Sequence, residues 1–344
     1  MRVLNEERDI CFHFARAFCN CKRRQAMTFV LIRKLLRDIR IPWLIVALLL
    51  FLFQILWSRV TQRVTHQILE QLGKMNVDPD FIRNTLFSKN DFSGQMIQAV
   101  MGGEDIRIEN ATDMMSVSYV HPLVITILSI WAIGRATSAI AGEIDRGTME
   151  LLLAQPIRRS QILLSHLCVD VLIFPALCIV LWTGTYCGTW WMGLQAPTES
   201  ERAAISANKV DGKVEIVRSK SQQVEPREFL RALPCIFALL FSVGGLTMAI
   251  SAMGRSRSVV WGCAVSLFLT MFLVNILGQI WPEWIGWLRP ATVYYHYQPQ
   301  LMILRDGWHN PAAWTHLAML AGFGVGGYIY AWLYFTRRDL PAPL

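Results

Sequence analysis

The residues that could do chemistry in this chain gather in one short stretch, EIDRGTMELLLAQPIRRS at 143–160, between two long apolar segments. Its three acids and three arginines could recognise a partner through complementary charge. Signatures of catalysis are missing: the sequence has no H-E-x-x-H, no G-x-S-x-G and no paired C-x-x-C. The Gly-Lys pairs at 73–74 and 212–213 lack the other residues of a phosphate-binding loop. We therefore expect no catalytic residue and no enzyme activity in this chain.

A second set of candidates consists of polar side chains that fall inside apolar segments, namely Arg135, Asp170, Asn275 and Gln279. Polar groups within a bilayer are costly and are often functional, so these four could line a substrate path. Arg135 and Asp170 could instead reach the interface or pair with each other, and the two amides could simply join neighbouring helices. The sequence leaves these alternatives open.

Residues 1–26 resemble nothing else in the chain and are expected to be a disordered tail or the result of a misplaced start, with Met27 as the true start. This segment holds Cys11, His13, Cys19 and Cys21, whose spacing lacks the paired C-x-x-C of a zinc site. We therefore expect no metal site.

The elements that must position these residues are membrane helices. The 344 residues are 53% hydrophobic and 17% charged, which is typical of a polytopic membrane protein. Exposed strand edges are not tolerated in lipid, so the predicted fold class is all-α. The apolar runs predict six transmembrane helices, at 41–57, 117–140, 163–192 (with a possible break at Pro175), 229–253, 259–281 and 314–335.

Lysine and arginine near the helix ends predict the orientation. Residues 1–40 carry ten Lys/Arg against four Asp/Glu, Arg255 and Arg257 lie between two spans, and Arg337 and Arg338 lie near the end. Both termini and 143–160 are therefore expected on the cytoplasmic side of the inner membrane, with extracytoplasmic inserts at 58–116 and 194–228. The net charge of +8 then indicates contact with anionic lipid and no need for nucleic acid.

Residues 27–40 alternate apolar and cationic side chains at helical spacing, which predicts an amphipathic elbow helix before the six-helix domain at 41–344. The pairs Gly184-x3-Gly188 and Gly322-x3-Gly326 predict close helix contacts.

Within 143–160, we expect a turn at 145–147, Thr148 as an N-cap and a short helix from Met149 to Ala154 that ends before Pro156. The three leucines at 151–153 need a cover. They could pack back on the bundle or enter a groove on another protein.

The run at 139–166 resembles the hallmark of the membrane permease subunits of type 2 ABC transporters. Eight residues fall on the pattern of acid, Gly-Thr, acid, leucines, proline and a basic residue: Glu143, Gly147, Thr148, Glu150, Leu151, Leu152, Pro156 and Arg159. Met149 departs from the usual leucine. Outside this run the resemblance is one of architecture.

The resemblance implies that the helix at about 147–155 is a cytoplasmic coupling helix, docked in a groove of a separate ATPase. The implied complex holds two ATPase copies, which carry ATP and Mg²⁺, and a second permease that is either a copy or a paralogue. This chain itself would bind no cofactor. The implied function is that of an ABC permease in an exporter, whose cargo the sequence does not identify. A secondary transporter or channel is the main alternative, and a membrane scaffold is a third.

Overall fold

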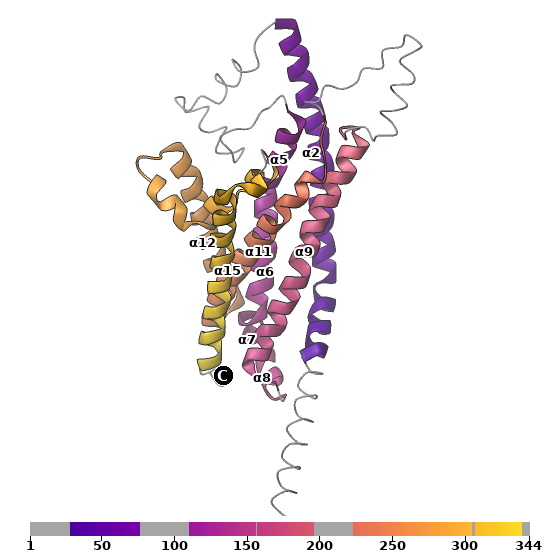
Figure 1. Ribbon diagram of the computed structural model, residues 1–344. Coiled ribbons are helices and arrows are strands. Elements are labelled where there is room, and N and C mark those ends of the chain that lie inside the picture. The colour runs from indigo at the N-terminus through magenta and orange to yellow at the C-terminus, as the bar shows by residue number, and fades with distance from the viewer. Residues whose placement is uncertain (1–27, 76–109, 156, 196–222, 305–306, 339–344) are drawn as a thin grey trace, which may run out of the picture.

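The computed structural model describes residues 28–75, 110–155, 157–195, 223–304 and 307–338, and the described chain is predominantly helical (Figure 1). Six helical segments are long and apolar enough to cross a membrane, as the sequence predicts. They are α2 (Arg40–Met75), α5 with α6 (Ala111–Val120 and Pro122–Ala139), α9 (Arg159–Trp191), α11 (Leu233–Met253), α12 (Arg257–Ile280) and α15 (Pro311–Arg337). Sheet pairing in the described chain is limited to one isolated bridge between Gln195 and Val224. The all-α class is therefore confirmed.

Residues 28–38 form a helix that leads into α2. The two are joined through Ile39, whose N–H donates to the Leu35 carbonyl and whose carbonyl accepts from Trp43 N–H. Leu31 is buried, whereas the cations from Arg33 to Arg40 are exposed, as are the apolar Phe29 and Val30. The predicted tail at 1–26, with Cys11, His13, Cys19 and Cys21, lies outside the described residues.

The first predicted insert, 58–116, is helical at both of its edges. α2 continues past Trp57 to Met75, and α5 begins at Ala111 with Asn110 as its N-cap, whose side chain accepts from Thr112 N–H at 3.1 Å. The rest of this insert, and most of the insert at 194–228, lies outside the described residues.

The second span is broken where α5 meets α6. Pro122 takes the first position of α6, where a missing N–H costs nothing. His121 is the N-cap, and its Nδ1 accepts from the Leu123 N–H at 3.2 Å. By contrast, α9 runs unbroken through Pro175, so the possible break there is absent.

The core lies around α11, which packs against α15, α6 and α9. Its closest approach is to α15, where a Cβ added to Gly324 would come within 2.3 Å of a Phe241 ring carbon. The predicted pair on α15 was wrong in register, because Gly322 and Gly326 have nothing within 4 Å while Gly324 and Gly327 face α11. The predicted pair Gly184 and Gly188 does make the close contact between α9 and α2.

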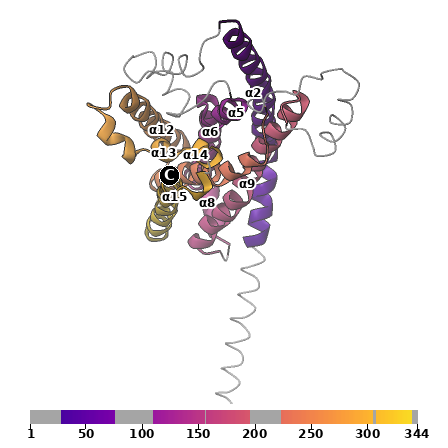
Figure 2. The same cartoon turned by 45° about the horizontal axis from the view of Figure 1, so that its top comes forward.

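α12 is the least enclosed of the later spans. Only 22% of its apolar window is buried, compared with 61% for the span that contains α11. It stands to one side of the bundle with the short helix η4 (Gly286–Ala291) in both views (Figures 1 and 2). Its exposed apolar side chains are therefore available to lipid or to another chain.

Candidate functional site

Two short helices carry the stretch that the sequence singled out. α7 (Ala141–Asp145) and α8 (Thr148–Leu153) lie at one end of the bundle, beside the beginning of α9 and the end of α15 (Figure 1). We call this the α8 end. The Ala141 N–H donates to Ser251 Oγ at 3.1 Å, which fixes α7 to the end of α11. The segment is thus anchored to the bundle.

A sharp turn separates α7 from α8. Gly147 has φ +69°, a left-handed conformation that favours glycine because other residues lose about 1–2 kcal/mol there. Glu143 closes the turn: its Oε1 accepts from Arg146 Nη2 at 2.5 Å, and the Thr148 hydroxyl lies 3.2 Å from its carbonyl oxygen and in contact with its Oε2. The expected turn is confirmed, but Thr148 as N-cap was wrong. Gly147 is the N-cap, and Thr148 is the first residue of α8.

The leucines of α8 divide between the two roles that the sequence left open. Leu152 and Leu153 are half-buried against a cluster that includes Ile140 and Met149. Leu151 is 69% exposed, and its neighbour Glu150 is also exposed. α8 therefore holds on to the bundle with one side and presents Leu151 and Glu150 on the other.

Two arginines, Arg159 and Arg338, connect the helix ends at the α8 end through hydrogen bonds. Arg159 is the first residue of α9, and its Nη1 donates to the Arg338 carbonyl oxygen. Arg338 in turn donates through Nη1 to the carbonyls of Ala252 (2.7 Å) and Gly254 (2.9 Å), which satisfies acceptors left free at the end of α11. Pro156 lies outside the described residues.

A buried polar network lies further into the bundle from α8. Arg135 of α6 and Asp170 of α9 are 7% and 1% exposed, and Arg135 Nε lies 3.3 Å from Asp170 Oδ1. The Tyr328 hydroxyl of α15 donates to Asp170 Oδ2 at 2.9 Å. Arg135 Nη1 lies 3.0 Å from His166 Nδ1, and since arginine can only donate, His166 must accept with Nδ1 and be neutral. The network thus joins α6, α9 and α15.

The other two intramembrane candidates lie elsewhere. Asn275 and Gln279 are in the last turns of α12, and Asn275 Oδ1 is 3.5 Å from Arg289 Nε of η4. Arg257, at the other end of α12, is next to Gly142 of α7. The structure therefore brings Arg135 and Asp170 together and leaves Asn275 and Gln279 toward the opposite end of the helix.

Two members of the network were missed from the sequence. His166 lies one helical turn before Asp170, so its i, i+4 spacing on an apolar helix was a usable signal. Tyr328 had no such signal, because its partner is 158 residues away.

Within the described part of the chain, no group of three His, Cys, Asp or Glu side chains could hold a metal ion. What the α8 end does present is an exposed surface, formed by Leu151 and Glu150, on a short helix that packs against the bundle.

Comparison with known proteins gives one finding. The family model described as "ABC-2 family transporter protein" matches residues 30–340. No curated protein and no solved structure matches the chain.

Proposed function

The chain belongs to the ABC-2 transporter family and is a multi-pass permease subunit, and on that premise we propose that ATP hydrolysis by a separate ATPase drives its transport cycle through α8. The transport is proposed to be export from the cytoplasm across the inner membrane, with both termini and α8 on the cytoplasmic side. The chain's own sequence has no phosphate-binding loop. ATP and Mg²⁺ would therefore be held by the ATPase.

The observation that carries the proposal is the division of α8 into a held side and a free side. Met149 is 3% exposed and anchors α8, while Leu151 is 69% exposed. An exposed apolar side chain on a helix can enter a groove of a partner protein, which is the helix-in-groove mode of recognition. We assign the contact to Leu151 and Glu150, with Glu143, Gly147 and Thr148 shaping the turn that presents them.

The other residues of the matching run have supporting roles in this proposal. Leu152 fixes α8 to the bundle and Arg159 ties α9 to the end of α15, while Pro156 lies between α8 and α9 in the sequence. Movement of α8 would then be passed on to α6, α9 and α15, which Arg135, Asp170 and Tyr328 hold together. The assembly would contain two ATPases and two permeases, the second permease being a copy or a paralogue.

Co-purification with a candidate ABC ATPase from the same genome tests the proposal. Wild-type chain in detergent should bring down the ATPase, and Leu151→Asp and Glu150→Arg should weaken the complex. For Leu151→Asp we expect about 30-fold or more in Kd, the size of a loss at an interface hot spot. Ser258→Asp is the matched control, because Ser258 is exposed at the start of α12 and the change adds the same charge outside α8. Equal binding by all four proteins would contradict the coupling role.

A secondary transporter is the second candidate, and the buried Arg135–Asp170 pair is the observation that favours it. Buried ionisable groups are typical of proton and ion pathways. The two candidates differ in what drives transport: a secondary transporter keeps its activity in vesicles without ATP, whereas the proposed permease stops.

A further inference from the structure

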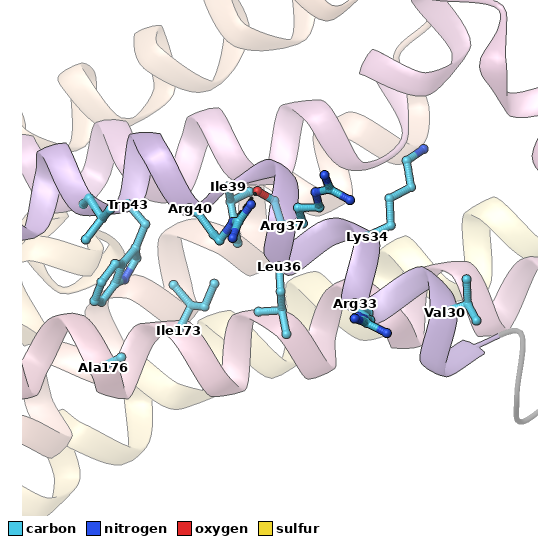
Figure 3. A pocket seen from close by; sticks show the side chains of 11 residues that line it. Val30, Arg33, Lys34, Leu36, Arg37, Ile39, Arg40, Trp43, Ile173 and Ala176 are labelled. Atoms are coloured by element: carbon cyan, nitrogen blue, oxygen red, sulfur yellow. Dashed lines mark hydrogen bonds between the residues drawn. The ribbon is translucent and has the colours of Figure 1, made fainter.

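A groove lies between the 28–38 helix, the first turns of α2 and the middle of α9 (Figure 3). Its volume is about 970 Å³, at the upper end of the range for ligand sites. Its walls are of two kinds, apolar and cationic, and the lining residues are Val30, Arg33, Lys34, Leu36, Arg37, Ile39, Arg40, Trp43, Leu44, Ile173 and Ala176.

The cationic wall belongs to the N-terminal helix. Arg33, Lys34 and Arg37 are exposed and form no ion pair with any described residue, while Arg40 Nε donates only to the Arg37 carbonyl at 3.3 Å. Asp38 is the one acid between Thr28 and Leu44. The groove therefore carries a net positive charge that the described residues do not neutralise.

The apolar wall faces α9. Ile173 is 9% exposed and Trp43 and Leu36 are half-buried, and Figure 3 shows Leu36 beside Ile173 and the Trp43 ring beside Ala176. Leu44, one residue beyond Trp43, is 58% exposed and extends the apolar surface along α2 toward the span. A ligand that fits both walls has an anionic head and a long apolar tail.

We propose that this groove is a binding site for one anionic glycerophospholipid, with its phosphate among Arg33, Lys34 and Arg37 and its acyl chains against Trp43, Leu44 and Ile173. The 28–38 helix, which forms one wall of the groove, lies toward the α8 end of the bundle (Figure 1). Arg159, Arg257 and Arg338 stand at the ends of α9, α12 and α15 on the same side. Anionic lipids attract such clusters in the cytoplasmic leaflet. A free phosphate would use the cations but leave the apolar wall without a partner, so we assign the site to the lipid.

Native mass spectrometry of the purified full chain in detergent tests this assignment without any ATPase, so its result is independent of the proposed coupling. The added probes are dioleoyl phosphatidylglycerol, dioleoyl phosphatidylcholine and glycerol phosphate, which separate charge, chains and head group. Wild type should bind one phosphatidylglycerol more tightly than phosphatidylcholine, and glycerol phosphate should not be retained.

Arg33→Gln with Arg37→Gln should weaken phosphatidylglycerol binding by about tenfold or more, on the scale of the attraction of single cations to anionic membranes. The control is Arg255→Gln with Arg257→Gln, which removes the same charge from two exposed arginines at the α8 end but outside the groove. This control should bind like wild type.

Ala176→Trp tests the apolar wall, because it fills the groove and leaves every cation in place. It should also lose the lipid. Its elution and melting temperature without lipid verify its fold, and if it fails to fold, the arginine pairs still decide, since they change only exposed side chains. Equal loss in both arginine pairs, equal affinity for the two lipids, or retention of glycerol phosphate in place of lipid would overturn the proposal.

Discussion

Asp170 is the residue on which the buried network depends, because it accepts from Tyr328 and lies against Arg135. Asp170→Asn should destabilise the fold by about 3–5 kcal/mol, since a buried arginine is left without its counter-charge. Tyr328→Phe removes only one hydrogen bond to a charged group and should cost about 1.5–3 kcal/mol. Equilibrium unfolding in mixed detergent and SDS micelles measures both.

The double variant Arg135→Met with Asp170→Leu tests whether the stability depends on the charges of the buried pair or only on filling its volume. It replaces the pair by apolar side chains and should recover most of the stability lost in Asp170→Asn, as buried pairs elsewhere do. A double variant as unstable as Asp170→Asn would show that the pair has a structural role beyond mutual neutralisation.

Substitution of Gly147 tests whether the left-handed turn before α8 is needed to present this helix. Its φ is +69° and an added Cβ would meet nothing within 4 Å, so Gly147→Ala is penalised by conformation alone. We expect a loss of about 1–2 kcal/mol, localised to the turn, and weaker ATPase binding in the same assay as Leu151→Asp.

Gly134→Ala is the matched control for that change. Gly134 also has nothing within 4 Å, but it lies inside α6 with ordinary helical backbone. There alanine should be neutral or stabilising by about 0.5–1 kcal/mol. Similar losses at both positions would mean that the left-handed turn has no special importance.

At the scale of elements, the contact between α11 and α15 predicts that alanine destabilises the protein at one glycine of α15 and not at a second glycine two residues away. Gly324→Ala places a Cβ 2.3 Å from a Phe241 ring carbon and 2.8 Å from the Phe241 carbonyl oxygen. The helices must separate, so we expect a loss of about 1–3 kcal/mol, as for other overpacked cores. Gly322→Ala, in the same helix but in open space, should cost nothing. Unfolding curves of the two variants, measured side by side, check this, and equal curves would contradict the contact.

The sequence was sufficient for the elements whose signal is local. A run of about twenty apolar residues has few alternatives to a membrane helix, and Gly147 marks its turn by its own backbone preference. The break between α5 and α6 at His121 was not predicted, because the sequence indicates a single helix for the span at 117–140. The contacts between helices were harder to predict from the sequence. Which glycines of α15 face α11 depends on how the helix is rotated, and 322, 324, 326 and 327 are all glycine.

The candidate site shows the same limit. Leu151, Leu152 and Leu153 are identical in type, so the sequence could not say which of them is free. The answer comes from distant residues, because Ile162 of α9 and Met248 of α11 belong to the cluster that covers Leu152 and Leu153 but not Leu151. For the same reason the pairing of Arg135 with Asp170 remained one alternative among several until the helices were placed.

At the scale of the whole molecule, the two ends differ in charge. Arg158, Arg159, Arg255, Arg257 and Arg338 lie at helix ends on the α8 side, which predicts that this side faces the cytoplasm. The coupling proposal requires that orientation, because the ATPase and its ATP are cytoplasmic. Topology is therefore the whole-molecule property that decides whether α8 can have its proposed partner.

The two ends of α12 allow a direct test. Ser258 lies in its first turn, at the α8 end, and Glu283 lies just beyond its last residue, and both are exposed. With the native cysteines replaced, Ser258→Cys should react with a membrane-impermeant maleimide only in inverted vesicles, and Glu283→Cys only in intact cells or spheroplasts. The opposite pattern would place α8 outside, where no ATPase can reach it, and would exclude the coupling role even if the fold and the family are unchanged. The expected pattern would leave Leu151 and Glu150 exposed to the cytoplasm, so that the co-purification with the ATPase then decides the coupling role.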